Sequence, residues 1–437
     1  MKRPTALLTP TALLTLTALL AGGLFPLKVP GTVSQAQETQ VRAIPPLPAS
    51  NMPVAVPDPP PTPQTPTEPT TVSPPLPDVT FGPPAPPFTD SLTFTPSPVP
   101  TATLPCAADA PNTFTLPDTA RPAGVTGRLG FYAAEYDPLT LAPLRAVSLD
   151  SGGVYPLASA FKTTVLHSLL RGVDDGRFRL SDLQTTTEAT RSIEGYSRGT
   201  NTLLTLARRM IARSENTAAD LLALRVGLPR IQADLDALGA KETRIQFTTK
   251  AWWSVQAGLV PALFPKGSLF ASAQRFSELP AAARLAQARQ VLQTVRGVNA
   301  DALDRQLDAY FHGPEYDPDT ELFVQNTSTP KEYACLNAEL FRSGLSASSA
   351  RVFRDLMATG LDHSPFPTPQ FRYWGGKPGS GWRLLTLTGY TETASGRVVA
   401  YAYFNDRSSV QDARAIGRQI LPADAWIRAQ VQAMLAR

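Results

Sequence analysis

The chain has 437 residues and a net charge of only +4, and 22 of its 44 prolines fall within residues 45–105. A weak charge without a basic block argues against a nucleic-acid-binding protein. A segment so rich in proline and so poor in apolar runs cannot bury enough surface to fold, and is typical of an extended tether. The residues that follow it are enough for one enzyme-sized domain.

The first residues have the features of a secretory signal peptide. Lys2 and Arg3 precede an apolar stretch at 6–25, and residues 34–36 offer a small-x-small cleavage site. We therefore expect export to the periplasm, the cell envelope or the extracellular space. An uncleaved stretch of this length would act as a membrane tether instead. The predicted organisation is a signal peptide at 1–36, a disordered linker at 37–122 and a folded domain at 123–437.

The folded part, which we expect to start near Gly124, opens with a strand and continues with helices. Apolar and aromatic residues in 128–135 are typical of a strand. In 160–170 apolar residues recur at steps of three and four, which predicts a helix. Thr202 is a candidate N-cap of a second helix. Further expected elements are a helix after Asn216 that ends at Gly227, a helix from Pro229 to Gly239, strands at 384–390 and 397–404, and two helices within 409–437.

One early strand, a helical middle, two late strands and terminal helices predict an α+β fold. Its sheet would be closed by pairing the two ends of the domain.

An S-x-x-K motif stands at the start of the first helix. Ser159 and Lys162 are three residues apart, which places the hydroxyl and the amine on one helical face. A serine needs a base to become a nucleophile, and lysine serves when burial or a second cation lowers the pKa of its ammonium group. A second copy at 328–331 has Pro330 well placed as the first residue of a helix, so we interpret that copy as structural.

Two more motifs follow the first one in a fixed order. Ser214 and Asn216 form an S-x-N motif in the turn between two predicted helices, and Lys377 to Ser380 come just before a strand. Singly, such residues are common as helix caps or strand-end charges, but the order of the three motifs favours function. At this point the chain resembles the serine β-lactamase and penicillin-binding-protein superfamily, and most of all its class A β-lactamases.

The resemblance covers Gly127 to about Ile245 and residues 326–437. ARSENTAADLLALRVG is similar to the S-D-N turn and the helix after it, and NTSTPKEYACLNAELF to the T-x-x-P helix start. The resemblance implies a β-lactamase/transpeptidase-like α+β fold, with an antiparallel sheet flanked by helices and a mostly helical subdomain.

The resemblance also implies a role for each motif residue. Ser159 would be the acylated nucleophile and Lys162 its base. Ser214 would pass a proton to the leaving nitrogen, and Asn216 would hydrogen-bond the substrate amide. The backbone N–H groups of Ser159 and Ser380 would form the oxyanion hole.

The third motif departs from the family pattern. Lys377 would supply positive potential toward a substrate carboxylate, but the K-T-G or K-S-G pattern has become Lys377-Pro378-Gly379. The hydroxyl that helps to bind the carboxylate is therefore missing. Proline is acceptable there if the strand lies at the edge of the sheet.

A second departure concerns deacylation. Class A enzymes carry a glutamate about 36 residues after the S-D-N serine, and here that count reaches Lys250. No acidic residue occurs from 243 to 277. An insertion at about 251–325 follows, with Trp252 and Trp253 at its start. Acidic residues return only at Glu278, so either an acid of the insertion replaces the missing base or deacylation is slow.

The cysteines and histidines limit the remaining chemistry. Cys106 and Cys335 would form a disulfide in an oxidising compartment, with two free thiols as the alternative. Three scattered histidines match no metal-ligand spacing, so we expect no metal and no cofactor.

The sequence thus predicts an exported, monomeric serine hydrolase, β-lactamase-like, that β-lactams or related amides and esters acylate at Ser159. The alternatives are a penicillin-recognising D-alanyl peptidase or esterase, or a catalytically dead wall-binding module. The expected partner is a small β-lactam or peptidoglycan-like substrate, not a nucleic acid.

Overall fold

The computed structural model describes residues 103–342, 344–361 and 370–436. Contacts divide the chain into two units, 1–85 and 86–437, and the described residues all belong to the second. The predicted signal peptide and the linker up to residue 102 lie outside the described residues. Within the described part, no helix is both long and apolar enough to cross a membrane.

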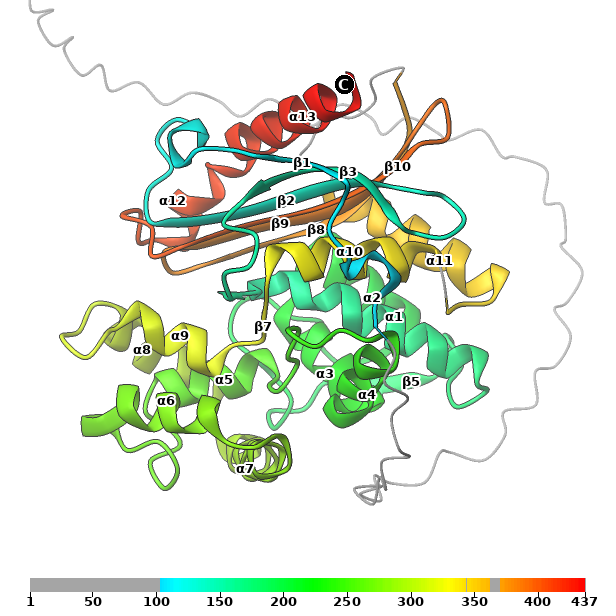
Figure 1. Ribbon diagram of the computed structural model, residues 1–437. Coiled ribbons are helices and arrows are strands. Elements are labelled where there is room, and N and C mark those ends of the chain that lie inside the picture. The colour runs from blue at the N-terminus through cyan, green and yellow to red at the C-terminus, as the bar shows by residue number, and fades with distance from the viewer. Residues whose placement is uncertain (1–102, 343, 362–369, 437) are drawn as a thin grey trace, which may run out of the picture. The chain divides into compact units, whose positions relative to one another are not determined.

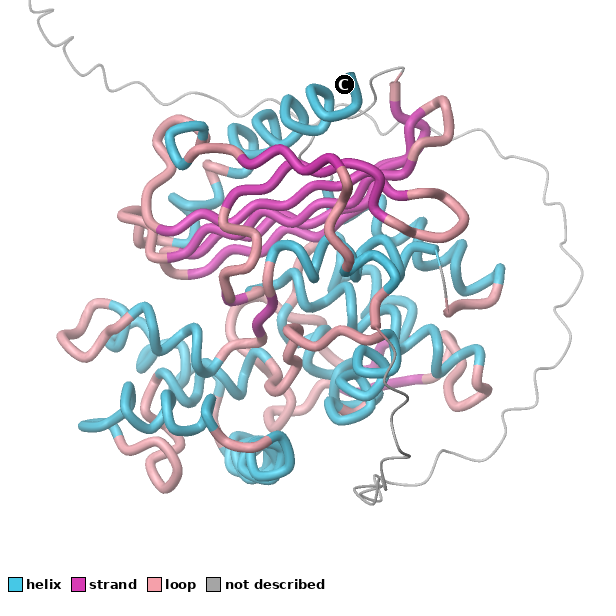
Figure 2. Tube along the Cα trace, in the orientation of Figure 1, coloured by secondary structure: helices cyan, strands magenta, loops and turns pink. Residues whose placement is uncertain are grey.

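A six-stranded sheet forms one half of the described domain (Figures 1 and 2), in the order β1-β3-β2-β10-β9-β8. The β1–β3 pair is parallel and the other pairs are antiparallel. Pairing of β2 with β10 joins the early and late parts of the domain, which confirms the predicted closure. The strands are β1 (Asn112–Thr115), β2 (Arg128–Tyr136), β3 (Pro143–Leu149), β8 (Phe371–Gly381), β9 (Leu384–Thr393) and β10 (Val398–Asp406).

Both faces of the central strands are covered, because both alternating sets of side chains are apolar. One face of the sheet packs on α13 (Ile420–Ala436), where Ile427 and Val431 are fully buried. The other face packs on α10 (Pro330–Arg342). Burying one such aliphatic side chain contributes about 2 kcal/mol, so α13 helps to fix the sheet that carries part of the site.

The helical part lies beyond α10, on the side of the sheet away from α13 (Figure 1). Its longer helices are α1 (Lys162–Asp174), α2 (Leu203–Ala212), α3 (Asn216–Val226), α4 (Leu228–Leu238), α5 (Thr249–Gln256), α6 (Leu269–Glu278), α7 (Ala281–Thr294), α8 (Ala300–Phe311), α9 (Pro318–Val324) and α11 (Ala347–Ala358). The short elements are η1 (Pro105–Ala107), η2 (Asp118–Ala120), η3 (Ala158–Phe161), η4 (Lys266–Ser268), η5 (Val295–Gly297), η6 (Thr359–Leu361), β4 (Tyr155–Pro156), β5 (Leu183–Thr185), β6 (Thr200–Thr202), β7 (Thr327–Ser328) and α12 (Ala413–Gly417).

The structure confirms three of the sequence signals for helix starts and ends. The Thr202 side chain accepts from the backbone N–H of Thr205 and so caps α2. Gly239 ends α4 in the left-handed conformation, with φ 87°. Pro330 is the first residue of α10, and the second S-x-x-K copy is therefore a helix start.

The strand count and the start of the domain need correction. The prediction of one early and two late strands missed β1, β3 and β8 of the large sheet and the short strands β4 to β7. The motif at 377–380 lies within β8 rather than just before a strand. The folded part also begins before Gly124, because β1 pairs with β3 and Leu104 is buried in the core.

The region expected as an insertion is helical, spanning α5 to α9. It packs against the turn between β8 and β9, where the Phe311 ring stacks on Trp382 with centroids 4.9 Å apart. Asp319 of α9 forms an ion pair with Arg407, which follows β10. The region therefore covers the end of the sheet at which the third motif stands.

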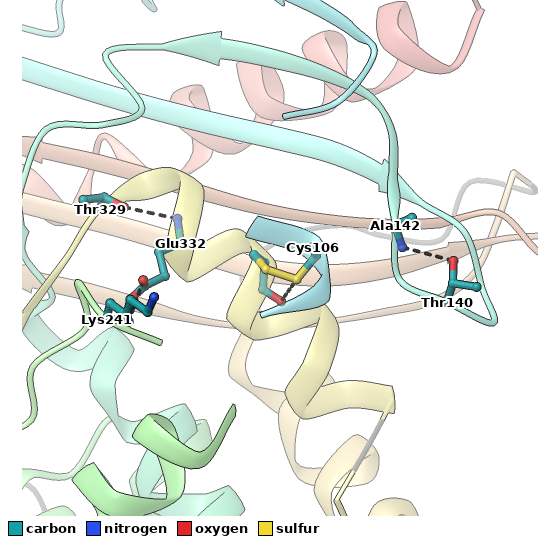
Figure 3. Close-up of a disulfide and its surroundings, with 7 residues drawn as sticks. Cys106, Thr140, Ala142, Lys241, Thr329 and Glu332 are labelled. Carbon is teal, nitrogen blue, oxygen red and sulfur yellow. Dashed lines mark hydrogen bonds between the residues drawn. A yellow bond between two sulfur atoms is a disulfide. The ribbon is translucent and has the colours of Figure 1, made fainter. Parts of the chain in front are cut away.

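A disulfide joins Cys106 in η1 to Cys335 in α10 (Figure 3), with their Cα atoms 5.4 Å apart. Both cysteines are fully buried. The bridge thus closes a loop that contains strands β1 to β7 and helices α1 to α9.

Replacing both cysteines, as Cys106→Ala together with Cys335→Ala, should lower the free energy of unfolding by up to about 5 kcal/mol, because the bridge restricts a very long loop in the unfolded chain. Urea unfolding of the unreduced wild type and of the double variant measures this difference. Two alkylatable thiols in the untreated, unfolded wild type would contradict the bridge.

Candidate active site

Ser159 lies in the 3-10 turn η3, immediately before α1. In a 3-10 turn residues i and i+3 are eclipsed, so Lys162 comes one turn after Ser159 on the same face. Ala158, just before the serine, has φ 43°, in the left-handed region that few non-glycine residues adopt. The surrounding structure must stabilise this strained backbone, as is common at functional sites.

Three hydrogen bonds hold the serine turn. The backbone N–H of Leu157 donates to the carbonyl of Asn326 at 2.8 Å. Thr386 of β9 donates its hydroxyl to the Leu157 carbonyl at 3.0 Å. Tyr333 of α10 donates its hydroxyl to the Ala160 carbonyl at 2.6 Å. The sheet and α10 therefore fix Ser159 from both sides.

Lys162 is fully buried and connects the first two motifs. Its Nζ donates to Asn216 Oδ1 at 2.8 Å, to Ser214 Oγ at 3.2 Å and to the Ser214 carbonyl at 2.5 Å. Burial lowers the pKa of Lys162 to about 8, against the opposing attraction of Asp220, Glu194 and Glu215. An amine with such a pKa is a competent base near neutral pH.

Ser214 lies between α2 and α3, and its φ of 54° is also in the left-handed region. The middle residue of the motif, Glu215, accepts from the backbone N–H and the hydroxyl of Ser197, at 2.7 and 3.0 Å. It also forms an ion pair with Arg209. Glu215 thus holds the turn through its contacts with Ser197 and Arg209, while Ser214 and Asn216 contact Lys162.

The third motif stands beside the first, on edge strand β8. A Cβ atom at Gly379 would lie 2.6 Å from the backbone nitrogen of Ser159, so only glycine allows this close approach. The next residue, Ser380, is exposed. Pro378 is accommodated because β8 is the last strand of the sheet.

Lys377 is buried, and its Nζ donates to the carbonyl of Pro378 at 2.8 Å. Burial, and secondarily the charge of Lys162, hold the pKa of Lys377 well below its usual value. We therefore expect Lys377 to supply the predicted positive potential only when an anion binds next to its amine.

Lys250 does not replace the expected glutamate. Its Nζ donates to the carbonyls of Glu188 and Ala189, at 3.0 and 3.1 Å. Asp220 of α3 accepts from the backbone N–H groups of Thr249 and Lys250, at 2.7 and 2.9 Å. The start of α5 is therefore fixed, and the Lys250 amine is held by two carbonyl groups.

One acidic residue at the site was not predicted. Glu194 Oε2 accepts from Asn216 Nδ2 at 2.7 Å. Glu278, the acid named from the sequence, is exposed at the end of α6. No local sequence pattern marks Glu194. The only sequence signal that could have suggested it is that no other glutamate occurs within the 22 residues before the S-x-N motif.

The structure thus brings Lys162, Ser214 and Asn216 into direct contact and places β8 against the backbone of Ser159. The hydroxyl of Ser159 makes no hydrogen bond to another described residue. Such looseness is common in unliganded sites.

Acylation should depend on pH through Lys162. With its pKa lowered to about 8, the amine is mostly protonated at lower pH and cannot accept the serine proton. The second-order rate of acylation should fall about tenfold for each pH unit below 8 and level off above it. Stopped-flow measurements from pH 6 to 9.5 check this, and a flat profile would remove Lys162 as the base.

The serine–lysine centre on this α+β fold is that of a β-lactamase-like serine hydrolase. A model of the Beta-lactamase enzyme family matches residues 127–423. The chain therefore belongs to this family. Comparison with curated protein sequences found no match.

Solved structures of β-lactamases and of PBP-A are similar to this chain at low sequence identity. A beta lactamase from Burkholderia vietnamiensis is 19% identical over 70% of this chain and 91% of that chain, with a TM-score of 0.46. The last common ancestor of Gram-negative bacteria beta-lactamase class A is 20% identical over 69% and 93%, with a TM-score of 0.46. A variant of PBP-A, in an acyl-enzyme complex with penicillin G, is 16% identical over 70% and 91%, with a TM-score of 0.43.

Proposed function

We propose that the protein is an exported serine hydrolase that β-lactams, or related amides and esters, acylate at Ser159. The observation that supports this most is the buried Lys162 amine. It is held between Ser214 and Asn216, one turn from the serine, and its pKa is lowered to about 8.

In the proposed reaction Ser159 Oγ attacks the carbonyl carbon of the scissile amide, and Lys162 takes the hydroxyl proton. The oxyanion of the tetrahedral intermediate accepts hydrogen bonds from the backbone N–H groups of Ser159 and Ser380. The carbon–nitrogen bond then breaks, and the proton on Lys162 passes through Ser214 Oγ, 3.2 Å away, to the leaving nitrogen. The product is an ester on Ser159.

Lys377 would recognise the carboxylate that β-lactams carry beside the reacting ring. A bound anion would stabilise the protonated form of this buried lysine and raise its pKa again. Since Pro378 offers neither a hydroxyl nor an N–H there, we expect the carboxylate to bind less tightly than in a site with the usual threonine or serine.

A second candidate, a penicillin-recognising D-alanyl peptidase or esterase, is favoured by the position of Lys250. Its amine is bonded to two backbone carbonyls, so it offers no base for hydrolysis of the ester. A long-lived acyl-enzyme is typical of a penicillin-recognising peptidase when it meets a β-lactam.

Fluorescent penicillin with subsequent washout tests these functions. We expect a covalent label of one equivalent, located by mass spectrometry of the peptide that contains Ser159 and absent from Ser159→Ala. Rapid loss of the label supports a β-lactamase and persistent label a peptidase. No label on a folded wild type would contradict the proposal and favour the wall-binding alternative.

Export is part of the proposal and is supported by the sequence of residues 1–36. Expression of the full chain in a bacterium, followed by fractionation, should place the protein outside the cytoplasm. A mature N-terminus at Gln37 would indicate cleavage, whereas an intact N-terminus in the membrane fraction would indicate an anchor. A cytoplasmic protein that retains Met1 would contradict export.

A further inference from the structure

A cavity of about 260 Å³ lies in the inserted region. The last turns of α5 and α8 form it, together with η4 and the turn after α8. None of its lining residues belongs to the three motifs. Pockets for drug-sized ligands are usually larger, about 300–1,000 Å³, so this cavity suits a compact molecule.

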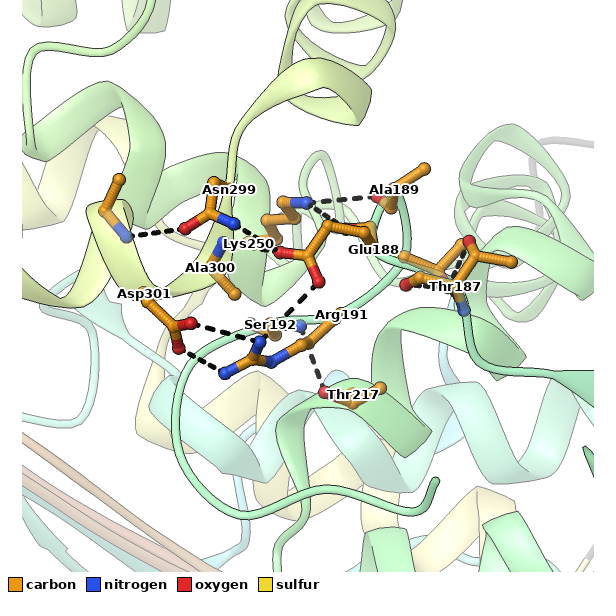
Figure 4. A network of polar contacts seen from close by, with 12 residues as sticks. Thr187, Glu188, Ala189, Arg191, Ser192, Thr217, Lys250, Asn299, Ala300 and Asp301 are labelled. Atoms are coloured by element: carbon orange, nitrogen blue, oxygen red, sulfur yellow. Dashed lines mark hydrogen bonds and ion pairs between the residues drawn. The ribbon is translucent and has the colours of Figure 1, made fainter. Parts of the chain in front are cut away.

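The two helices that form the cavity are fixed at their first residues (Figure 4). Near the start of α5, Lys250 donates to the carbonyls of Glu188 and Ala189. At the start of α8, Glu188 Oε1 accepts from Asn299 Nδ2 and from the backbone N–H of Ala300, at 3.0 and 3.1 Å. Because a helix rises about 1.5 Å per residue, the cavity lies about 12 Å from this network along α5 and about 18 Å along α8. The network therefore holds both walls of the cavity in place.

Gln256, the last residue of α5, lines the cavity although its side chain is only 1% exposed. Its amide favours the ionised form of the neighbouring Glu321 carboxyl and so lowers the pKa of that group. Neither Nε2 nor Oε1 of Gln256, however, forms a hydrogen bond of ordinary geometry to a described residue. A single partner would in any case use only one of these two atoms. A buried polar atom without a partner is costly, so this side chain points to an occupant that bonds to it.

Two opposite charges also line the cavity. Lys266 comes from η4 and Glu315 from the turn after α8, and both residues are exposed. The stem of Lys266 lies next to Gly258, where a Cβ atom would be 3.5 Å from the Lys266 Cγ. Among the described residues, neither Lys266 nor Glu315 forms an ion pair, with each other or with a third residue. Both charges are therefore available to an occupant.

We propose that this cavity is a binding site for a zwitterionic dipeptide. The carboxylate of the dipeptide would pair with Lys266 and its ammonium with Glu315. The Gln256 amide would donate to the carbonyl of the peptide group and accept from its N–H. This binding site goes beyond the proposed function, because it does not involve Ser159.

Calorimetric titration of the full chain with glycylglycine tests the site, because this probe is compact, achiral and zwitterionic at neutral pH. We expect saturable binding with a Kd of about 1 mM, in the range for a ligand with so few non-hydrogen atoms. N-acetylglycylglycine lacks the ammonium and glycylglycine amide lacks the carboxylate, so each should bind about fivefold more weakly. Low ionic strength keeps the ion pairs from being screened.

Two exposed variants assign each charge of the probe to its partner. In Glu315→Gln, glycylglycine and N-acetylglycylglycine should bind equally well, while the amide stays about fivefold weaker. In Lys266→Met, glycylglycine and its amide should bind equally well instead. Gln256→Leu, which keeps a similar volume, should weaken binding of all three probes. The matched control is Lys241→Met, an exposed lysine outside the cavity, which should keep the wild-type affinities.

Absence of saturable glycylglycine binding to the wild type would overturn the inference. So would a preference for the free ammonium that persists in Glu315→Gln. Both charge variants should still be acylated by benzylpenicillin at the wild-type rate, since neither residue belongs to the three motifs. The titration needs no acylation, so a wild type that benzylpenicillin fails to label would contradict the proposed function and leave this site standing.

Discussion

Replacing Lys162 by methionine should slow acylation of Ser159 by a penicillin about 10²–10⁴-fold at neutral pH, the usual contribution of a general base. The amine is the basic group that contacts both Ser214 and Asn216, and without it the serine proton has no acceptor in the turn. Methionine has a similar length, so it fills most of the space that the buried lysine occupies. The measurement is the rate of covalent labelling under single-turnover conditions.

The matched control for this variant is Lys331→Met, in the second S-x-x-K copy. Lys331 forms an ion pair with Asp109 at 2.5 Å and lies at the start of α10, away from the first motif in sequence. It should label at the wild-type rate. Circular dichroism should show both variants folded. Undiminished labelling of Lys162→Met would exclude the lysine from the mechanism.

Acylation should outrun deacylation, so that a good β-lactam gives a burst of about one equivalent of product followed by a slow steady state. In the proposed reaction, acylation uses Ser159, Lys162 and Ser214; the Lys162 amine contacts Ser214, and Ser159 lies in the turn just before Lys162. Deacylation needs a base beside the attacking water, and the Lys250 amine is instead bonded to two carbonyls. Loss of a general base costs about 10²–10⁴ in rate.

Stopped-flow kinetics with benzylpenicillin measure both phases of this reaction. The burst amplitude should scale with enzyme concentration, and Ser159→Ala should show neither phase. Steady turnover at hundreds per second without a burst would approach the rate of efficient enzymes, about 10³ per second. It would show that another base activates the water that hydrolyses the ester. An acid of the inserted region would then be the candidate.

Helix ends were predictable because their signals are local. Thr202 bonds to a residue three positions away, and Gly239 provides a left-handed conformation by itself. Strand β8 was missed because it contains four glycines and Pro378, residues that are depleted in strands. Its place in the sheet depends on pairing with β9 and on the close approach of Gly379 to Ser159.

In the site, too, features with local sequence signals could be predicted and features that depend on distant contacts could not. The spacing of Ser159 and Lys162 follows from one helical turn, and the order of the motifs suggested which residues accompany them. Glu194 could not be found in this way, since its contact with Asn216 depends on a left-handed backbone and on hydrogen bonds from distant segments. A strained loop conformation of this kind leaves no periodic pattern in the sequence.

The disulfide also determines how the domain would respond to mechanical force. Tension applied to the chain ahead of Cys106 reaches that residue before it reaches β1, and the covalent bond passes it directly to α10 at Cys335. The parallel hydrogen bonds between β1 and β3 are then not peeled apart one by one. Only after reduction of the bridge would a pull from the N-terminal side be carried by this edge of the sheet.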